Sequence, residues 1–399
     1  MVKKDYKLAY FVTHPIPYQA PLLRKIANKD SIDFKTFFIS DHTVRPHFDK
    51  DFNQITKWDT LLLEGYDHTF LKKILNAKGF SFFSPFVYGI SKSLREKKWD
   101  AIWIHGYNHF SLILVLFLAS LYKIPILFRA ESTLLATKSN FFKDILIRLL
   151  IKLSSGLLYI GNSNKDYYLK YGATESQLFF TPYAVDNEIY KFTNQEKEEI
   201  SERLIKENNI DEEAIIILFV GKFIDRKNPL LLLEAFYEVI RQQPQNKFVL
   251  LYVGTGPDLE LIENKIKQYY LDAKVKLLGF KNEKELTEYY SIADLLVLPS
   301  KEETFGLVIN EAMSAGTAII ASNKVGSSQD LVIDGINGFI FESDNLESLT
   351  SILKKALSNK EALFNMAKKS EEMIKVWDYE KDVEGIISAL DSNFKRVIK

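Results

Sequence analysis

Two glutamates with seven residues between them, Glu303 and Glu311, stand in the segment PSKEETFGLVINEAMSAG, residues 299–316. The strand-like run LLVLP precedes them, and we expect a helix to begin at Phe305 and Gly306. A glycine at a helix start lets the backbone approach a phosphate, which the free N–H groups stabilise. Glu311 would lie about two turns into this helix, where its carboxylate could accept hydrogen bonds from two vicinal ribose hydroxyls. Glu303 could hold a sugar hydroxyl; solvated charges at a helix edge are the alternative for both.

Two lysines, Lys222 and Lys227, follow the glycine that ends another strand-like run, AIIILFVG. A diphosphate that leaves a sugar gains negative charge as the bond breaks, and two fixed cations lower that barrier. A single lysine is more often a solvated surface charge. Two of them at the end of one buried strand favour a diphosphate site.

Two glycine-containing loops fit neither a dinucleotide site nor a P-loop. After Gly254 and Gly256, the pattern G-x-G-x-x-G requires a glycine where Leu259 stands. After Gly221 and Lys222, Phe223 occupies the Ser/Thr position of a Walker A loop. Both departures count against a dehydrogenase and an NTPase.

Metal chemistry has little support in the sequence. The triplet Asp49-Lys50-Asp51 matches a D-x-D pattern, but no strand-like run precedes it, and the six histidines include no H-E-x-x-H motif. The absence of cysteine excludes disulfides, thiolate catalysis and Cys-ligated zinc. We therefore predict no metal and no cofactor.

Several motifs together resemble the GT-B glycosyltransferases, specifically the large retaining family called family 4. Besides the two spaced glutamates, the resemblance rests on GKFIDRKN at 221–228, VGTGPD at 253–258, LLGF at 277–280, YYSIADLLVLPS at 289–300 and DGINGFIF at 334–341. It implies metal-independent transfer of a sugar, with retained configuration, from a nucleotide diphosphate sugar as co-substrate. The donor is a UDP-sugar by default, with a GDP-sugar as the alternative, and the acceptor is a glycan, a lipid-linked sugar or a polysaccharide of the cell envelope.

The resemblance also assigns site residues in the second half of the chain. Lys222 and Lys227 match the clamp on the donor diphosphate, and Glu303 matches a catalytic position at the donor sugar. The remaining donor-binding positions are Gly221, Gly254, Gly256, Phe280, Thr304, Phe305, Gly306, Leu307 and Glu311.

The first half carries the acceptor side in this family. In the loop THPIPYQ, His14 and Tyr18 could reach the acceptor, because Pro15 and Pro17 stiffen the loop. The segment HPIPYQAPL, which contains His14 and Tyr18, resembles one known branch of the family. His105 and Tyr107, in the segment HGY, resemble the same branch.

Arg129 stands where many members carry a histidine near the donor sugar, and we include it with Glu131 among the catalytic candidates. An arginine cannot lose its proton near neutral pH, so it cannot act as a general base. Glu131 could bind acceptor hydroxyls or stabilise positive charge on the sugar carbon. A structural salt bridge between Arg129 and Glu131 is the alternative.

These residues need a scaffold of alternating strands and helices, which the sequence supplies twice. The expected strands are 8–13, 34–39, 101–105, 126–129, 157–160 and 178–181 in the first half, and 214–221, 248–254, 274–279, 295–299, 317–322 and 338–341 in the second. We predict an α/β protein of GT-B type, with two facing doubly wound domains and a cleft between them. The domains span 1–189 and 190–377, and a tail helix, 378–399, packs back on the first.

Charge is balanced over the chain, with 52 basic and 52 acidic residues, so a nucleic-acid partner is not expected. Residues 1–190 nevertheless hold 25 basic and 17 acidic residues, a net charge of +8. The segment Lys138–Lys152, KSNFFKDILIRLLIK, mixes cations with apolar residues and could contact an anionic membrane; an ordinary amphipathic helix is the alternative. We expect a cytoplasmic protein, peripheral at the inner face of the membrane if that contact forms.

Two other functions remain open at this stage. A non-hydrolytic sugar-nucleotide binder or an epimerase would use the same fold and the same donor. An NAD-dependent oxidoreductase is more distant, because the fingerprint glycine is missing.

Overall fold

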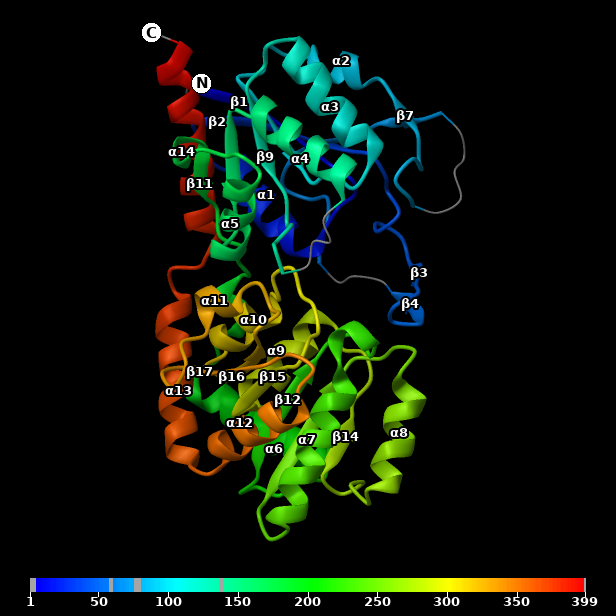
Figure 1. The fold of residues 1–399 in the computed structure, drawn as a ribbon, viewed down its shortest axis with the longest axis vertical. Helices are drawn as coiled ribbons and strands as arrows, with labels where there is room; N and C mark the ends of the chain where they lie inside the picture. The colour runs from blue at the N-terminus through cyan, green and yellow to red at the C-terminus, as the bar shows by residue number, and fades with distance from the viewer. Residues whose placement is uncertain (1–4, 57–59, 75–79, 136–139, 398–399) are drawn as a thin grey trace. The chain divides into compact units, whose positions relative to one another are not determined.

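A computed structural model describes the chain except for residues 1–4, 57–59, 75–79, 136–139 and 398–399. The chain divides into two compact units (Figure 1). The first comprises Met1–His47, Lys57–Tyr183 and Tyr379–Lys399, and the second comprises Phe48–Thr56 and Ala184–Asp378. The division thus falls after Tyr183 and not after residue 189, and a short early segment joins the second unit.

The first unit is built on a seven-stranded sheet in the order β11-β10-β9-β8-β1-β2-β5. Its neighbouring strands all pair in parallel. The strands are β1 (Tyr6–Val12), β2 (Ile32–Phe38), β5 (Asp67–Phe70), β8 (Ala101–His105), β9 (Ile126–Arg129), β10 (Gly156–Tyr159) and β11 (Leu178–Phe180). Runs such as AIWIH in β8 are buried throughout, as expected for a sheet covered on both faces.

Helices cover both faces of this sheet. They are α1 (Ala20–Ala27), α2 (Ile90–Leu94), α3 (Phe110–Leu121), α4 (Phe141–Leu153), α5 (Asn162–Lys170) and α14 (Tyr379–Val397), with short 3-10 turns at Pro17–Gln19 and Glu175–Gln177 and a small pair of strands, β6 (Lys72–Lys73) and β7 (Val87–Tyr88). The last helix, α14, lies along the first unit beside β11 (Figure 1). Its apolar residues Val383, Ile386 and Leu390 join the core of that unit. Gly385 allows the close approach, because a Cβ there would come 2.0 Å from the backbone oxygen of Phe180.

The second unit is built on a six-stranded sheet in the order β14-β13-β12-β15-β16-β17, also parallel. The strands are β12 (Ile215–Val220), β13 (Phe248–Val253), β14 (Val275–Leu277), β15 (Leu295–Leu298), β16 (Ala318–Ser322) and β17 (Gly338–Phe341). A separate two-stranded sheet pairs β3 (His47–Asp49) with β4 (Gln54–Thr56).

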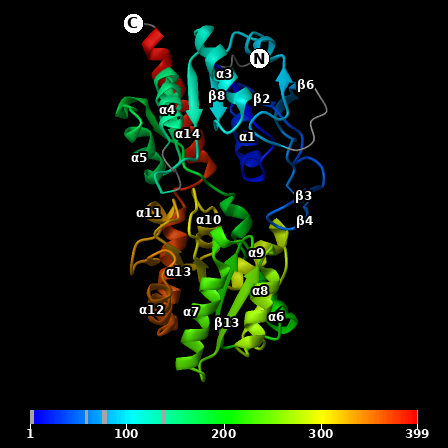
Figure 2. The same cartoon turned by 45° about the vertical axis from the view of Figure 1, so that its right-hand side comes forward.

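Two apolar layers enclose this second sheet. The helices are α6 (Asn194–Glu207), α7 (Pro229–Gln242), α8 (Leu259–Gln268), α9 (Glu283–Ile292), α10 (Val308–Ser314), α11 (Ser328–Leu331), α12 (Leu346–Leu357) and α13 (Lys360–Ile374), with 3-10 turns at Asn187–Tyr190 and Asp225–Lys227. Residues of α7, α8 and α12 form one core layer with the sheet, and α7 and α12 lie side by side (Figure 2). Residues of α6, α9 and α10 form the other layer. Within the described residues, no helix is long and apolar enough to cross a membrane.

Candidate functional site

Each sheet has a point where the strand order reverses. In the first unit the chain proceeds outward from β1 to β2 and β5, and then returns to place β8 on the other side of β1. In the second unit β12 and β15 have the same relation. Ligands of doubly wound sheets bind beyond the carboxyl ends of the strands at such a point. The residues singled out from the sequence follow these strands.

In the second unit, the loop after β12 places the two lysines. Phe223, between them, is fully buried in the core and anchors the loop. The loop then forms the 3-10 turn Asp225–Lys227, and Asn228 takes a left-handed φ of 53° before Pro229 begins α7. The side chain of Lys227 runs beside Gly221, whose ideal Cβ position is 4.0 Å from the Lys227 Cδ.

Gly254 is required by the packing of two loops. A Cβ at this position would come 1.9 Å from the backbone oxygen of Gly221. The backbone N–H of Gly221 donates to the oxygen of Val253 at 3.0 Å, and that of Phe223 donates to Thr255 at 2.9 Å. These contacts join the loops after β12 and β13, so they account for Gly254 without a ligand.

Lys227 interacts with both glutamates. Its ammonium group forms an ion pair with Glu303, which is only 8% exposed. Arg226 adds a longer contact to the other Glu303 oxygen, at 3.8 Å. The charge of Lys227 also acts on Glu311 and lowers the pKa of that carboxylate.

The loop that carries Glu303 is fixed by its backbone and by glycines. The N–H of Glu303 donates to Lys324 at 3.0 Å, and its carbonyl accepts from Gly326 at 3.0 Å. Gly306 has a φ of +96°, which disfavours a side chain. The helix α10 begins at Val308 and not at Phe305 and Gly306, so the prediction of its start was wrong. Glu311 therefore lies in the first turn of a seven-residue helix.

The Glu311 carboxylate has an unusual proton affinity. Burial raises its pKa to about 7, because it outweighs the hydrogen bond from Tyr290, at 2.6 Å, and the attraction of Lys227. Tyr290 lies on α9 and reaches the Oε2 atom. This contact was not predicted, because a tyrosine on a buried helix face is common and does not indicate a site.

Lys222 has partners that the sequence did not suggest. Its ammonium group contacts Asp49 at 3.1 Å and Asp51 at 3.2 Å, both from the early segment that joins the second unit. The Phe52 ring lies 4.7 Å from the same nitrogen and meets the Phe280 ring at 5.2 Å. The D-x-D triplet, which was not accepted as a metal site from the sequence, thus supplies the ion-pair partners of Lys222, the candidate for binding the diphosphate.

The other donor-binding candidates lie in the same loops. Phe305 is buried and its ring lies 6.1 Å from that of Trp377. Leu307 packs against the core layer that contains α10. The oxygen of Thr304 lies against Gly326, where a Cβ would come within 2.0 Å of it.

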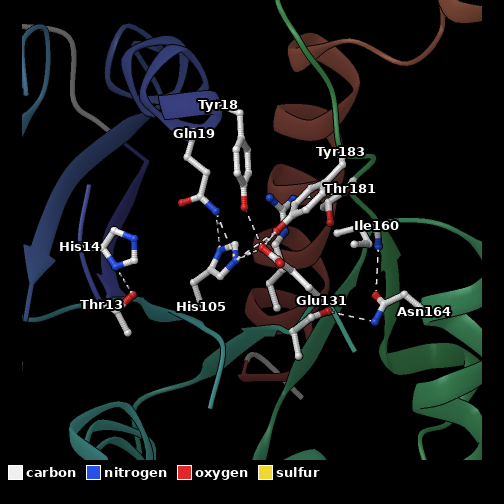
Figure 3. A network of polar contacts seen from close by, with 12 residues as sticks. Thr13, His14, Tyr18, Gln19, His105, Glu131, Ile160, Asn164, Thr181 and Tyr183 are labelled. Carbon is white, nitrogen blue, oxygen red and sulfur yellow. Dashed lines mark hydrogen bonds and ion pairs between the residues drawn. The ribbon is translucent and has the colours of Figure 1, made fainter. Parts of the chain in front are cut away.

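In the first unit, Glu131 is the centre of a polar network (Figure 3). Its Oε1 atom accepts hydrogen bonds from Tyr18 at 2.8 Å, from His105 at 3.2 Å and from Tyr183. Burial alone would raise the pKa of Glu131, but the hydrogen bonds from His105 and the two tyrosines outweigh it and lower the pKa to about 2. The side chain is still 36% exposed, so an ionised carboxylate is held in place and open to a ligand.

His105 connects this carboxylate to the core. Burial lowers its pKa, so the ring is neutral near pH 7. Tyr10 donates to the Gln19 oxygen at 2.5 Å, and the Gln19 amide lies 3.0 Å from His105 Nδ1. These hydrogen bonds make His105 Nδ1 an acceptor. The single ring proton of the neutral imidazole is therefore on Nε2, which faces Glu131. Gln19 was quoted only within the segments THPIPYQ and HPIPYQAPL, Tyr10 lay within an expected strand, and Tyr183 was not singled out as a site residue.

Arg129 is fully buried beside this network, and it forms its ion pair with Asp382 of α14 at 2.5 Å. It also donates to the oxygen of Thr181 at 3.2 Å, and its guanidinium lies 5.0 Å from the centre of the Trp103 ring. The suggested pairing with Glu131 is therefore wrong. Asp382 lies on the apolar stripe of α14 with Val383 and Ile386, and a charge in that position was the available signal.

The remaining first-half candidates lie among other partners. His14 contacts the hydroxyl of Thr13 at 2.9 Å, and its ring lies 4.4 Å from that of His42. Tyr107 contacts the hydroxyls of Ser132 at 2.8 Å and Tyr167 at 3.0 Å. Across the part of the chain that the structure describes, no group of three or more His, Asp or Glu side chains could hold a metal ion.

The sequence of the second unit matches a known family. The family model of the glycosyl transferases group 1 covers residues 200–373. The matched segment holds both lysines and both glutamates of the candidate site.

The chain is also similar in sequence to curated proteins that are named as glycosyltransferases. The chain is 28% identical over 242 residues to an uncharacterized glycosyltransferase of Methanocaldococcus jannaschii. The aligned residues cover 58% of this chain and 64% of that protein. This chain is 32% identical over 171 residues to a lipopolysaccharide 1,2-N-acetylglucosaminetransferase of Salmonella typhimurium, covering 40% and 44%. A D-inositol 3-phosphate glycosyltransferase of Geodermatophilus obscurus is 28% identical over 226 residues, covering 55% and 48%. The match thus spans between 44% and 64% of these three relatives.

Solved structures extend the likeness to the whole fold. HepE of Anabaena, in complex with UDP, has a TM-score of 0.75 and 16% identity, covering 97% of this chain and 100% of that one. A sucrose-phosphate synthase from Thermosynechococcus elongatus has a TM-score of 0.72 and 18% identity, covering 98% and 100%. With its two parallel-sheet units, the chain has the GT-B fold, and this prediction is confirmed.

Proposed function

We propose that this protein is a retaining glycosyltransferase that moves a sugar from a nucleotide diphosphate sugar to a hydroxyl group of an acceptor. The observation that carries the proposal is the cluster of Lys227, Glu303 and Glu311 beyond the switch-point strands β12 and β15 of a group 1 domain. A cation beside a buried carboxylate suits a diphosphate next to a hydroxyl-rich sugar.

In the proposed reaction the bond between the anomeric carbon and the phosphate oxygen breaks, and its electron pair goes to that oxygen. The acceptor hydroxyl bonds to the anomeric carbon on the same face, and its proton passes to the departing phosphate. Lys222 and Lys227 stabilise the charge of the diphosphate, and Glu303 holds a donor-sugar hydroxyl. The reaction needs neither a protein base nor a metal.

The donor would bind with its ribose at Glu311. The Oε2 atom of this carboxylate accepts from Tyr290, and the other oxygen could accept from the ribose hydroxyls. We propose UDP as the nucleotide, with GDP as the alternative, because HepE of Anabaena was solved in complex with UDP and with UDP-glucose.

The acceptor would bind in the first unit at Glu131. A carboxylate with a pKa of about 2 stays ionised at all working pH values, so it serves as a fixed hydrogen-bond acceptor for sugar hydroxyls and is a poor proton acceptor. We propose that the acceptor is a glycan, a lipid-linked sugar or a growing polysaccharide of the cell envelope.

We also propose that the protein works in the cytoplasm, with peripheral contact to an anionic membrane through α4. Phe141 is 73% exposed and Phe142 is 80% exposed at the start of this helix, and Arg148 and Lys152 are exposed further along it. Lys138, at the start of the segment identified from the sequence, lies outside the described residues. Exposed apolar rings on a helix that also exposes cations suit an anionic lipid surface.

A non-hydrolytic sugar-nucleotide binder or an epimerase would use the same donor site but would not need an acceptor. Turnover separates these functions: purified protein is incubated with a UDP-sugar and candidate glycan acceptors, with and without EDTA, and UDP release is measured. The proposal expects acceptor-dependent release of UDP that EDTA does not change. UDP-sugar that binds and is epimerised, or binds without UDP release for any acceptor, contradicts it, and activity lost in EDTA contradicts the metal-independent part.

A further inference from the structure

The β3–β4 hairpin, residues 47–56, has an unexpected location in the chain's organisation. Residues 48–56 of the hairpin group with the second unit, although the chain up to His47 belongs to the first. Among the described residues up to Tyr183, no other segment is placed in the second unit. The hairpin therefore contacts residues of the second unit that are far from it in the sequence.

These contacts are with Lys222. Its ammonium nitrogen lies 3.2 Å and 3.1 Å from the two oxygens of Asp49, and 3.2 Å from an oxygen of Asp51. An ammonium group has three N–H donors, and these three oxygens use all of them. A phosphate oxygen can bind Lys222 only when at least one of these hydrogen bonds is given up.

The hairpin is shaped for this contact. The Oδ1 atom of Asp49 also accepts from the backbone N–H groups of Asp51 at 2.9 Å and Phe52 at 3.2 Å, which fixes the carboxylate within the turn. Asp49 is 19% exposed and Lys222 is 24% exposed, so the pair is partly shielded from solvent. Burial opposes the charge of Asp49, but the hydrogen bonds from Lys222 and from the backbone lower its pKa overall.

Two further contacts seat the hairpin on the donor-binding loops. The ring of Phe52 meets Phe280 edge-on at 5.2 Å. The backbone oxygen of Asp51 lies against Gly256, where a Cβ would come within 2.9 Å of it. Gly256 and Phe280 are both candidates for binding the donor, so the hairpin covers more than one part of that site.

We propose that the β3–β4 hairpin is an anionic plug, in which Asp49 and Asp51 occupy Lys222 until the donor diphosphate displaces them. This inference rests on the proposed role of Lys222 at the donor diphosphate. Two carboxylates and a diphosphate carry like charges, so they cannot share the lysine without strong repulsion. Donor binding and release of the hairpin are therefore coupled.

The plug makes a quantitative prediction. A hairpin that covers Lys222 for nine-tenths of the time weakens the apparent affinity about tenfold. The double variant Asp49→Asn/Asp51→Asn removes both charges, and an asparagine at 49 can still accept from the backbone N–H groups. We expect this variant to bind UDP and inorganic pyrophosphate about tenfold more tightly than the wild type, with the difference decreasing at high salt.

The chain offers a matched control. Lys247 also pairs with two carboxylates of one segment, Asp211 at 3.2 Å and Glu213 at 2.6 Å, before the strands β12 and β13 begin. The variant Asp211→Asn/Glu213→Gln makes the same change of charge in the same unit and should leave the affinity within about twofold. Equal gains in both variants would mean a general effect of charge and would overturn the plug.

The variant Lys222→Ala separates the plug from the proposed function. If it binds UDP and pyrophosphate as the wild type does, Lys222 is not at the diphosphate and both proposals about this residue are wrong. If it loses affinity while Asp49→Asn/Asp51→Asn binds no more tightly than the wild type, the plug alone is wrong.

Release of the hairpin can be observed directly, because the chain has no cysteine. A nitroxide label on Lys50→Cys, an exposed position in the turn, should become more mobile when UDP saturates the protein. A label on Tyr270→Cys, which is 91% exposed on the same unit, should not respond. An unchanged spectrum at Lys50→Cys under conditions where UDP is bound would overturn the proposal.

Discussion

Glu311 connects the proposed nucleotide binding to pH. Burial raises its pKa to about 7 in the free protein, and ribose hydroxyls that donate to the carboxylate would lower the pKa again. Binding should therefore release a proton near neutral pH, and affinity should rise between pH 6 and 8. Calorimetry with a UDP-sugar tests this, because its diphosphate does not titrate in this range, and buffers of different ionisation enthalpy report the released proton.

The variant Glu311→Gln is the control for this pH dependence. It should bind about tenfold more weakly at pH 8, because a neutral amide replaces a charged acceptor, and its affinity should not change with pH. The folding stability of the free protein should change with pH in the opposite direction to the affinity. Because the pKa of Glu311 is raised in the folded state, its contribution to stability is fully present below about pH 4.5 and is lost as the pH rises through about 7. A wild-type affinity that is flat across this range would show that Glu311 does not contact the ribose.

Glu131 should affect turnover and not nucleotide binding, because it belongs to the first unit. The variant Glu131→Gln loses a charged acceptor with three donors, which is worth about 1.5–3 kcal/mol, or about tenfold to a hundredfold in kcat/KM for the acceptor. Steady-state kinetics at saturating donor measures this. Tyr171→Phe, which removes a hydroxyl bonded to Asp144 elsewhere in the unit, should change little. If UDP affinity falls with Glu131→Gln, the assignment to the acceptor is wrong.

At the residue scale, the sequence predicts the types of site residue but not their partners. Lys227, Glu303 and Glu311 were singled out by spacing; in the structure Lys227 forms an ion pair with Glu303 and acts electrostatically on Glu311. Tyr290 and Asp382 were missed because their roles depend on residues far away in the chain. Position in a motif is local information, whereas an ion pair across the fold is not.

At the element scale, α14 stabilises the first unit through an ion pair as well as through apolar packing. Removal of the Asp382 carboxylate would leave Arg129 charged and fully buried. We expect Asp382→Ala to lower the stability of the first unit by about 3–5 kcal/mol. The double variant Arg129→Met/Asp382→Ala should recover part of the loss, since no buried charge remains unpaired. Urea unfolding followed by tryptophan fluorescence measures both, and Trp103 beside Arg129 contributes to this signal with the three other tryptophans.

The elements themselves follow closely from the sequence. All twelve expected strands occur, because buried parallel strands are short, continuous apolar runs. The edge strand β5 was missed since its sequence, DHTF, is polar and half exposed. The start of α10 was misplaced because Gly306 adopts a left-handed φ before the helix, and the amino-acid types alone do not distinguish that turn from a first helical residue.

At the scale of the whole molecule, the periodicity of apolar residues does not show which distant segments pack together. One such placement was expected and another was not. The tail helix was expected to return to the first unit, and it packs there against β10 and β11. The hairpin of residues 48–56 was not expected in the second unit. Its seating depends on two ion pairs with Lys222 and on one aromatic contact, and none of these leaves a repeating pattern in the sequence.

The uneven charge of the chain leads to a prediction about membranes. The first 190 residues carry a net charge of +8, and α4 exposes Phe141 and Phe142 near its cations. Burial of a phenylalanine side chain contributes about 1.5–3 kcal/mol, so Phe141→Ser/Phe142→Ser should weaken binding to anionic vesicles at least about tenfold. Cosedimentation with phosphatidylglycerol vesicles at low and high salt measures this, with phosphatidylcholine as the neutral lipid.

A control for this experiment lies on the second unit. Tyr270 is 91% exposed and Phe364 is 57% exposed, and Tyr270→Ser/Phe364→Ser removes a similar amount of exposed aromatic surface. This variant should bind vesicles as the wild type does, since α4 is unchanged. Wild-type protein that sediments equally with anionic and neutral vesicles, or with neither, would contradict a membrane role for α4. The basic charge of the first half would then serve the acceptor or solubility instead.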